Sequence, residues 1–391
     1  MNRLVEFDEN TGVLRAEAGT TIADVLGTFV PRGWFPRVTP GTKHVSIGGC
    51  IAADVHGKNH HHHGSFGEHT HSFNLIVANG KSRICKPGNS NSDLFWASLG
   101  GMGLTGIIAE ASIQLQPIES AWVMAKHQPA SNLETIMNLM EDAAKDDEYS
   151  VVWIDCLAKG KNLGRSIYMS GHHAGIDELP RRLSENPLAF SNAQPKQVPS
   201  WFPSSVLNPL TVKGFNLAYN WQQGRKTRPF LSSLDKFFYP LDSLGQWNRI
   251  YGKKGFYQYQ CALPEKNAHQ GLTQVLERLS EAGCGSFLAV LKRFGKSSKG
   301  LLSFPQPGYT LALDIPRNRS GILELLEELD ALIVSHGGRV YLAKDARLSA
   351  EAMAQMYPNL PKWLKIKSRI DPDNRFESDM SRRLKLGGTH A

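Results

Sequence analysis

The chain has 391 residues, of which 41% are hydrophobic and 20% are charged, and its formal net charge is +8. This length accommodates two domains, and the composition is that of an ordinary globular protein. No apolar run approaches the roughly eighteen residues that a membrane span needs, and the N-terminus lacks the regions of a signal peptide, so we expect a cytoplasmic protein. The positive charge suits an anionic partner. Nucleic acid, an anionic lipid surface and a phosphate-bearing substrate are the three alternatives.

The five cysteines exclude two further classes of protein. They are an odd number without CxxC spacing, so the sequence indicates neither a disulfide framework nor a zinc site. We expect reduced and mostly buried thiols. The cysteines are Cys50, Cys85, Cys156, Cys261 and Cys284.

The first part of the chain reads as short strands and turns with one early helix. The pattern predicts strands over 4–8, 13–19 and 106–118, a helix over 21–33 and a hairpin over 72–86 that turns at Asn79-Gly80. Parallel βαβ units are not indicated. The expected fold class of this region is therefore α+β.

The glycine-rich stretch 38–67 contains six glycines among small and β-branched residues. Glycine is worth its entropic cost where the backbone must approach a ligand closely, so a flat, extended cofactor is the natural candidate. The spacing is neither GxGxxG nor GxxxxGK. The Gly48-Gly49 pair precedes a strand-like segment and gives main-chain N–H groups room to point at a phosphate or ring carbonyl. A second cluster, 99–106, follows a predicted helix over 91–99. The alternative is a pair of tight turns.

Histidines are concentrated in the same stretch. Consecutive side chains of the run His60 to His63 diverge, and no Cys, Asp or Glu lies at ligand spacing, so we expect a solvated polar turn rather than a metal site. His56 lies inside the glycine-rich stretch, and we expect it beside the bound ligand.

Longer units follow from about residue 120. The pattern predicts a helix over 131–145, strands over 149–158 and 164–173, a helix over 320–338 and a strand over 339–345. The Pro-rich segment 187–209 exposes aromatic and aliphatic residues between prolines, which is typical of a mobile lid.

Four polar residues of this region are candidates for a site. Gln258 and Gln260 alternate with tyrosines and so share one face of a strand, either toward a polyhydroxylated ligand or toward solvent. Lys292 lies among apolar residues, which favours burial with a partner. Lys344 ends the alternating strand 339–345, where a solvated lysine is the alternative.

A set of segments spread over nearly the whole chain resembles one enzyme family, the flavin-dependent oxidase subunit of decaprenylphosphoryl-β-D-ribose 2-epimerase. The segments are VTPGTKHVSIGG, DVHGKNHH, LFWASLGGMGLTGI, WIDCLAKGKNLGRSIYM, FFYPLD, WNRIYG, GFYQYQ, LKRFG and YLAKDARL. The resemblance implies an α+β, two-domain flavoprotein of the vanillyl-alcohol-oxidase (PCMH) type. Its FAD-binding domain spans 1–118, an antiparallel-sheet substrate domain spans 119–338, and the segment 339–391 returns to the FAD domain.

The resemblance also assigns roles to residues. FAD, held without a covalent bond, is lined by Gly41, Ser46, Ile47, Gly48, Gly49, Ala53, Asp54, Val55, His56, Ile108 and Tyr341. Gln258, Gln260, Lys292 and Lys344 bind the sugar, and Lys344 and His56 are the catalytic residues. Lys344 either stabilises the anionic reduced flavin or acts as the base if burial lowers its pKa.

The activity implied is oxidation of the 2-hydroxyl of a polyprenylphosphoryl-β-D-ribose at a membrane surface, with an NADH-dependent short-chain reductase as partner. Alternatives are an aldonolactone or free-sugar oxidase of the same fold, and a flavin-poor remnant that only binds a partner. Nucleic acid is not an expected partner, because the basic residues are dispersed.

Two features depart from the family pattern. Members begin with a further glycine- and arginine-rich segment before the position of Met1, so we expect a late start, a truncation or weak FAD binding. Members that react covalently with nitroaromatic inhibitors carry a cysteine where this chain has Ala312, so we expect no adduct there.

Overall fold

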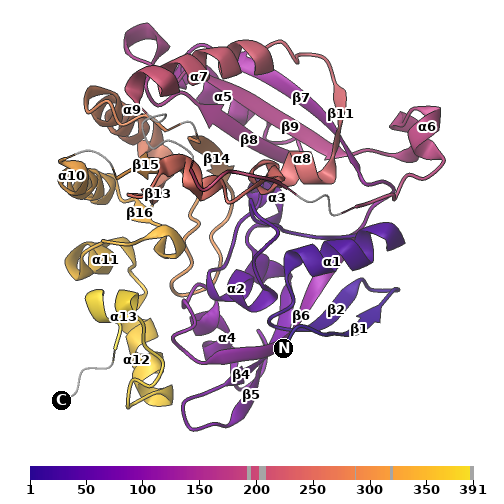
Figure 1. The fold of residues 1–391 in the computed structure, drawn as a ribbon. Coiled ribbons are helices and arrows are strands. Elements are labelled where there is room, and N and C mark those ends of the chain that lie inside the picture. Colours follow the sequence, from indigo (N-terminus) through magenta and orange to yellow (C-terminus); the bar gives the residue numbers. More distant parts are fainter. Residues whose placement is uncertain (192–194, 202–207, 287, 318–319, 388–391) are drawn as a thin grey trace.

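The computed structural model describes residues 1–191, 195–201, 208–286, 288–317 and 320–387. Within these ranges the chain forms a smaller and a larger antiparallel sheet with helices around both (Figure 1). This is the predicted α+β fold. The lid predicted over 187–209 falls partly on residues 192–194 and 202–207, which lie outside the described residues, so it stays a prediction. No helix in the described ranges is both long and apolar enough to cross a membrane.

The smaller sheet is built from the N-terminal region, with β6 at its centre. Its strand order is β1-β2-β6-β4-β5, and β3 also pairs with β6. The strands are β1 (Leu4–Asp8), β2 (Val13–Glu17), β3 (Trp34–Pro36), β4 (Thr70–Ile76), β5 (Ser82–Cys85) and β6 (Ile107–Pro117). The β4–β5 hairpin and the left-handed Gly80 (φ 78°) confirm the predicted Asn79-Gly80 turn.

Three helices of this region shape the approach to the site. Helix α1 (Ile22–Phe29) begins with a capping box between Thr21 and Asp24, as expected for the helix predicted over 21–33. Helix α4 (Ser92–Ser98) confirms the helix predicted over 91–99. Helix α2 (Ile47–Ala52) corrects the strand-like interpretation of the segment after Gly48-Gly49. It forms because Ser46 caps its first turn and its apolar residues recur at helical spacing.

The larger sheet has the order β11-β7-β9-β8-β14-β15-β13-β16. Its strands are β7 (Trp122–Ala130), β8 (Tyr149–Ile154), β9 (Ser166–His173), β11 (Phe230–Ser233), β13 (Phe256–Pro264), β14 (Val290–Phe294), β15 (Gly308–Pro316) and β16 (Arg339–Val340). Two short strands, β10 (Lys196–Gln197) and β12 (Leu244–Gly245), pair separately. The remaining α-helices are α3 (His60–His63), α5 (Leu133–Ala143), α6 (Arg181–Ser184), α7 (Pro209–Gln223), α8 (Leu234–Phe238), α9 (Glu265–Glu281), α10 (Ile322–Ser335), α11 (Ala350–Met356), α12 (Leu360–Ile370) and α13 (Asp379–Arg383).

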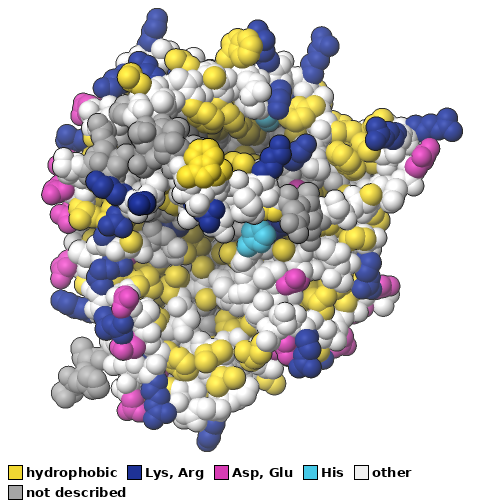
Figure 2. Space-filling model, viewed as in Figure 1, with side chains coloured by type: hydrophobic (Ala, Val, Ile, Leu, Met, Phe, Trp, Pro, Cys, Tyr) yellow, Lys and Arg dark blue, Asp and Glu magenta, His cyan; other side chains and the backbone are white. Residues whose placement is uncertain are grey.

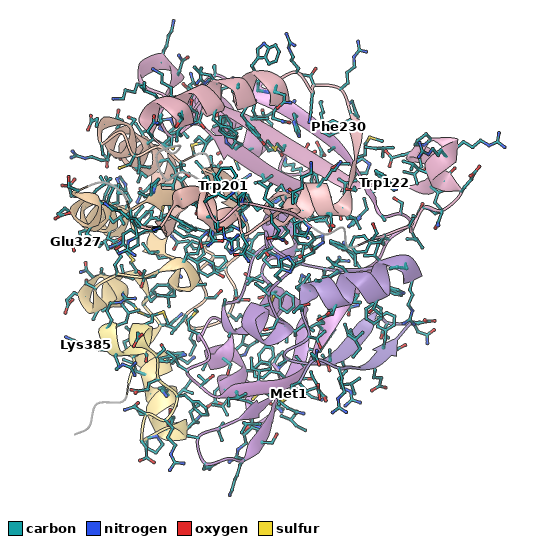
Figure 3. All side chains as sticks on the ribbon, in the orientation of Figure 1. Met1, Trp122, Trp201, Phe230, Glu327 and Lys385 are labelled. Carbon is teal, nitrogen blue, oxygen red and sulfur yellow. The ribbon has the colours of Figure 1, made fainter. Side chains whose placement is uncertain are left out.

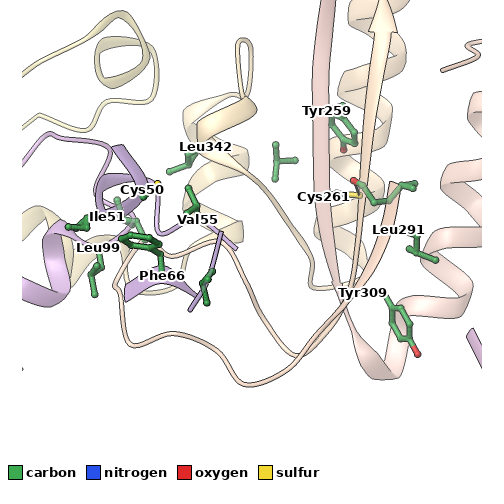
Figure 4. Packing of buried hydrophobic residues seen from close by; sticks show 14 of the residues in the cluster. Cys50, Ile51, Val55, Phe66, Leu99, Tyr259, Cys261, Leu291, Tyr309 and Leu342 are labelled. Carbon is green, nitrogen blue, oxygen red and sulfur yellow. Dashed lines mark hydrogen bonds between the residues drawn. The ribbon is translucent and has the colours of Figure 1, made fainter. Parts of the chain in front are cut away.

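The central strands of the larger sheet bury one face. Tyr259, Cys261, Leu291 and Leu311 point to the side covered by α9 and α10, and Figure 4 shows several of these core side chains. The same core cluster continues into the N-terminal region, around Phe66. All five cysteines are buried and none of them is in a disulfide bond, as expected. Because side chains alternate along a strand, the opposite face of β13, β14 and β15 carries the other residues.

The C-terminal segment lies against the N-terminal region, as the yellow and violet ribbons of Figure 1 show. The indole Nε1 of Trp363 in α12 donates to the carbonyl of Ala97 at 2.8 Å. The strand predicted over 339–345 is shorter than expected. Strand β16 ends at Val340, and Lys344 lies in a 3-10 turn, η8 (Leu342–Lys344), which forms because the Lys344 N–H donates to the Tyr341 carbonyl.

The contact of Trp363 gives a stability prediction. Trp363→Phe removes the donor and leaves the buried Ala97 carbonyl unpaired, so we expect the free energy of unfolding to fall by about 1–3 kcal/mol. Denaturant titration monitored by circular dichroism measures the loss. Trp221→Phe is the matched control, because Trp221 is exposed, and it should change stability by less than about 0.5 kcal/mol. Equal losses in the two variants would contradict this account.

Candidate active site

The face of β13, β14 and β15 opposite to α9 and α10 is polar and forms the floor of the candidate site. Register pairs Gln258 with Asp314, Gln260 with Ala312, and Lys292 with Thr310, so all six side chains point to one side. We call them the polar face. The prediction that Gln258 and Gln260 share one strand face is confirmed. Ala312 is the smallest member and leaves room above the middle of the face.

His56 connects the glycine-rich stretch to the polar face. The amide Nε2 of Gln260 lies 3.0 Å from His56 Nε2 and 3.0 Å from the Thr310 hydroxyl. A side-chain amide nitrogen is only a donor, so the imidazole Nε2 accepts. In the neutral ring the proton is then on Nδ1, and this atom is buried without a hydrogen-bond partner. A buried unpaired N–H is costly and indicates a missing acceptor.

Aromatic rings enclose His56 and keep it neutral. Its ring centroid lies 4.8 Å from that of Phe294 and 5.3 Å from that of Tyr341. Burial, helped by the positive charge of Lys292 and other neighbours, lowers the pKa of His56 well below its usual value. Because the Nε2 lone pair is already engaged by Gln260, His56 is suited to donate from Nδ1 and not to accept a proton.

Three half-buried lysines converge on the same space. Burial lowers the pKa of Lys58 to about 7 and that of Lys292 to about 7, and Lys292 is also lowered by the charges of Lys344 and Lys58. The Lys58 ammonium donates to the carbonyl of Phe237 and lies 4.3 Å from the centre of its ring. This arrangement repels cations and favours an anion, which would restore the charge of the lysines.

Asp314 is the acidic counterpart of Lys344. Burial lowers the pKa of Lys344, and the Asp314 carboxylate opposes this shift. Asp314 is itself buried, and this burial raises its pKa. The positive charge of Lys344 acts in the opposite direction. It accepts from Gln258 Nε2 at 3.1 Å and from the Tyr251 hydroxyl at 3.4 Å. The carboxylate is therefore held in place at the end of the polar face.

The sequence did not single out Lys58, Asp314 or Thr310. Lys58 follows His56 by two residues, so its place in the glycine-rich stretch was a usable signal. Asp314 and Thr310 carry no local signal, because only the pairing of β15 with β13 brings them beside the glutamines. Lys344, Lys292, Gln258 and Gln260 are brought together as the predictions expected.

The predicted FAD-lining residues fall into two groups. Ala53 and His56 lie next to Tyr341, whose hydroxyl donates to the Ala53 carbonyl at 3.0 Å, and Val55 is buried between them in sequence. Ile108 is buried in the neighbouring strand β6. A side chain at Gly41 would meet nothing within 4 Å, so the backbone there borders open space.

The second group includes Gly48 and Gly49. For this pair the structure corrects the prediction that the main-chain N–H groups point at a ligand. The N–H of Gly48 donates to the Ala18 carbonyl at 2.8 Å, and that of Gly49 donates to Ser46 Oγ at 3.1 Å. Neither donor is therefore free to bind a phosphate, because each is used to dock or cap α2. Ile47 is fully buried in the same helix.

Asp54 makes buried hydrogen bonds within the protein and is not exposed to a ligand site. Its carboxylate is fully buried, accepts from the Gly67 N–H at 2.9 Å and from the Ser303 hydroxyl at 2.5 Å, and burial raises its pKa. Its backbone is left-handed, with φ 41°. Asp54 thus fixes the loop before His56 against the segment that follows β14.

The histidine run is a short helix, α3, and not a solvated turn. His60 is buried, accepts from the Gly295 N–H through Nδ1 at 3.1 Å and contacts the Ser65 hydroxyl through Nε2. Burial lowers its pKa to about 3. Across the described ranges, no three His, Cys, Asp or Glu side chains gather closely enough to hold a metal ion.

The residues present fit the expected FAD. The unpartnered Nδ1–H of His56 offers a donor, the lysines favour the negative charge that a flavin acquires on reduction, and the aromatic rings of Phe294, Phe304 and Tyr341 supply an apolar wall. His56 and Tyr341 would hold the group from the N-terminal and C-terminal sides.

Comparisons with known proteins agree with this geometry. Residues 1–86 match the FAD binding domain family, and residues 253–384 match the D-arabinono-1,4-lactone oxidase family. Decaprenylphosphoryl-β-D-ribose oxidase of Mycolicibacterium smegmatis is 38% identical over 99% of this chain and 84% of its own length. L-gulonolactone oxidase 3 of Arabidopsis thaliana is 21% identical over 99% of this chain and 72% of its own length.

A protein of the mprA 5′ region in Streptomyces coelicolor is 34% identical over 94% of this chain and its whole length. Two relatives above 30% identity, each matched over at least 94% of this chain, and two matching families place the chain in one group. The chain belongs to the FAD-binding oxidoreductases of the vanillyl-alcohol-oxidase (PCMH) type and is an FAD-dependent oxidase related to decaprenylphosphoryl-β-D-ribose oxidase and the aldonolactone oxidases.

Proposed function

We propose that this enzyme oxidises the 2-hydroxyl of a polyprenylphosphoryl-β-D-ribose to the 2-keto sugar. A separate NADH-dependent short-chain reductase would then reduce the ketone to the arabinose epimer. The relative from M. smegmatis, named as an oxidase of decaprenylphosphoryl-β-D-ribose, supports this substrate class.

The observation that carries the proposal is the convergence of Lys58, Lys292 and Lys344 on the polar face. Three lysines in a half-buried space repel one another unless an anion lies between them. A phosphoryl group linked to a sugar supplies that anion, whereas a neutral lactone does not. Gln258 and Gln260 offer amide groups for the ring hydroxyls.

The reaction removes a hydride from C2 and a proton from its hydroxyl. FAD, when bound, supplies the hydride acceptor. Lys344 receives the proton, because burial lowers its pKa toward the neutral amine. His56 does not compete for it, since its Nε2 already accepts from Gln260. Asp314 holds Lys344 electrostatically and accepts from Gln258, so it positions both groups.

A second candidate is an aldonolactone oxidase. The match of residues 253–384 to the D-arabinono-1,4-lactone oxidase family favours it, because this range contains all six residues of the polar face. The phosphate-free substrate would leave Lys58 and Lys292 without an anionic partner. Substrate charge therefore distinguishes the two candidates.

We expect anaerobic mixing of the purified, flavin-loaded enzyme with polyprenylphosphoryl ribose to bleach the flavin. L-gulono-1,4-lactone and D-arabinono-1,4-lactone at equal concentration should bleach it at least about tenfold more slowly, since they lack the anion that the lysines bind. Absorbance in a stopped-flow instrument measures both rates. Faster bleaching by a lactone would support the second candidate, and bleaching by neither substrate class would contradict both oxidase candidates.

Binding of the phosphoryl substrate should weaken as the pH rises through 7. Lys58 and Lys292, with pKa values of about 7, bind an anion when protonated and lose this charge at higher pH. Between about pH 6 and about pH 8 we expect KM to rise up to about tenfold for each lysine. Lys58→Met and Lys292→Met should flatten the profile, whereas Lys254→Met, at an exposed site, should not. A pH-independent KM in the unaltered enzyme would contradict the proposed anion site.

Asp314→Asn separates the two roles that the sequence left open for Lys344. Removing the carboxylate lowers the pKa of Lys344 further. If Lys344 is the base, the acid limb of the rate of flavin reduction moves to lower pH, which is the result we expect. Movement of an alkaline limb to lower pH would instead show that Lys344 acts as a cation. Tyr251→Phe, which removes the 3.4 Å hydroxyl contact to Asp314 and keeps the carboxylate, should shift neither limb by a comparable amount.

A further inference from the structure

The segment 186–234 has an unusual distribution of charge. It contains no Asp or Glu between Glu185 and Asp235, and all of its charged residues are basic. These are Lys196, Lys213, Arg225, Lys226 and Arg228. The whole chain has 36 acidic residues, so this stretch carries a local positive charge that its surroundings in sequence do not neutralise.

Helix α7 lies in this segment and is apolar on two opposite sides. At 100° per residue, Val212, Asn216 and Tyr219 share one side, and Leu210, Leu217 and Trp221 share the other. The first side is the attached one. Asn216 Nδ2 donates to Asp155 Oδ1 at 2.7 Å, and the ring of Tyr219 lies 4.8 Å from that of Trp153.

The second side faces solvent, and we call it the outer stripe of α7: Leu210, Lys213, Leu217 and Trp221. Leu210 is 81% exposed, Leu217 is 46% exposed and Trp221 is 61% exposed. Packing within the described chain does not account for these side chains, because α7 is already attached through its opposite side. Arg225 stacks on Trp221, with its guanidinium carbon 3.7 Å from the ring centre.

A further large apolar side chain is exposed outside the helix. Trp201, labelled in Figure 3, is 77% exposed and lies below α7 in that view. In Figure 2 the region over α7 shows hydrophobic and basic side chains together. Exposed apolar groups of this size commonly mark an interaction surface.

We propose that the outer stripe of α7 binds the surface of an anionic lipid bilayer. Leucine and tryptophan side chains enter the interface between headgroups and acyl chains, and Lys213, Arg225 and Lys226 pair with anionic headgroups. A second copy of this chain fits less well, because two acid-free basic faces repel each other. The partner is thus defined by charge complementarity and by the apolar stripe.

The position of α7 connects this surface to the active site. Trp153 of β8, which α7 contacts, pairs in register with Val290 of β14, two residues before Lys292. Paired residues point to the same side of a sheet, so α7 packs on the side of the sheet that bears the polar face. Membrane binding would present this side to a lipid-linked sugar. In this respect the inference rests on the proposed function, although lipid binding itself does not.

Vesicle sedimentation tests the surface without any turnover. The flavin-loaded enzyme should cosediment with vesicles of phosphatidylglycerol and phosphatidylcholine, less so at high salt, and weakly with phosphatidylcholine alone. Leu217→Ser combined with Trp221→Ser should lower the partition coefficient at least about tenfold. Arg225→Gln and Lys226→Gln should each lower it about fivefold.

The matched control is Ile84→Ser combined with Ile107→Ser, because both isoleucines are exposed on the smaller sheet, at 56% and 49%. This variant should bind vesicles as the unaltered enzyme does. Oxidation of a water-soluble short-chain phosphoryl ribose should be unchanged in the Leu217→Ser, Trp221→Ser variant. Such oxidation tests the proposed function separately from lipid binding.

Three results would overturn the proposal. One is vesicle binding that the α7 substitutions leave unchanged. Another is equal binding to neutral and anionic vesicles. The third is concentration-dependent self-association that the Leu217→Ser, Trp221→Ser variant abolishes, since this would make the outer stripe an interface between two copies. Sedimentation velocity of the enzyme alone measures the last.

Discussion

The division of strands β13, β14 and β15 into one apolar and one polar face is the constraint on which the site depends. Side chains alternate along each strand, so burying Tyr259, Cys261 and Leu311 under α9 and α10 forces Gln258, Gln260 and Thr310 to the other side. Antiparallel pairing then aligns these polar residues across strands. The same hydrophobic packing that stabilises the sheet therefore assembles the floor of the active site.

Burial also determines the chemistry of that floor. Lysines gathered in a half-buried space have lowered pKa values, so near neutral pH they exchange protons more readily than surface lysines. Under the proposed function, a phosphoryl group would restore the charge of Lys58 and Lys292, whereas the Asp314 carboxylate opposes the lowering of the Lys344 pKa. His56 is kept neutral by its aromatic surroundings and by Gln260, which directs its Nδ1–H away from the sheet. Under the proposed function, the polar face would separate anion binding from proton transfer.

Some parts of the fold and site were predictable, and others were not, for identifiable reasons. The capped helix α1 and the Asn79-Gly80 hairpin follow from local residue preferences. Helix α2 was missed because its glycines favour close backbone approach, and only the cap by Ser46 and the burial of its apolar side show a helix. Lys344 was placed on a strand because its neighbours alternate, although the chain leaves the sheet at Val340. His60 is buried because α3 packs on β14, a contact far away in sequence.

The sequence alone determined the class of protein, the close approach of backbone around residues 38–67, and the shared face of Gln258 and Gln260, because these depend on local patterns and on a resemblance distributed along the chain. The tertiary structure decided which groups meet. Asp314 faces Gln258 only through the register of β13 with β15, and Lys58 reaches the lysines of β14 and η8 only when the two sheets pack together. The structure also distinguished the attached side of α7 from its exposed stripe. Such contacts join residues separated by long stretches of chain, and no local pattern encodes their distance.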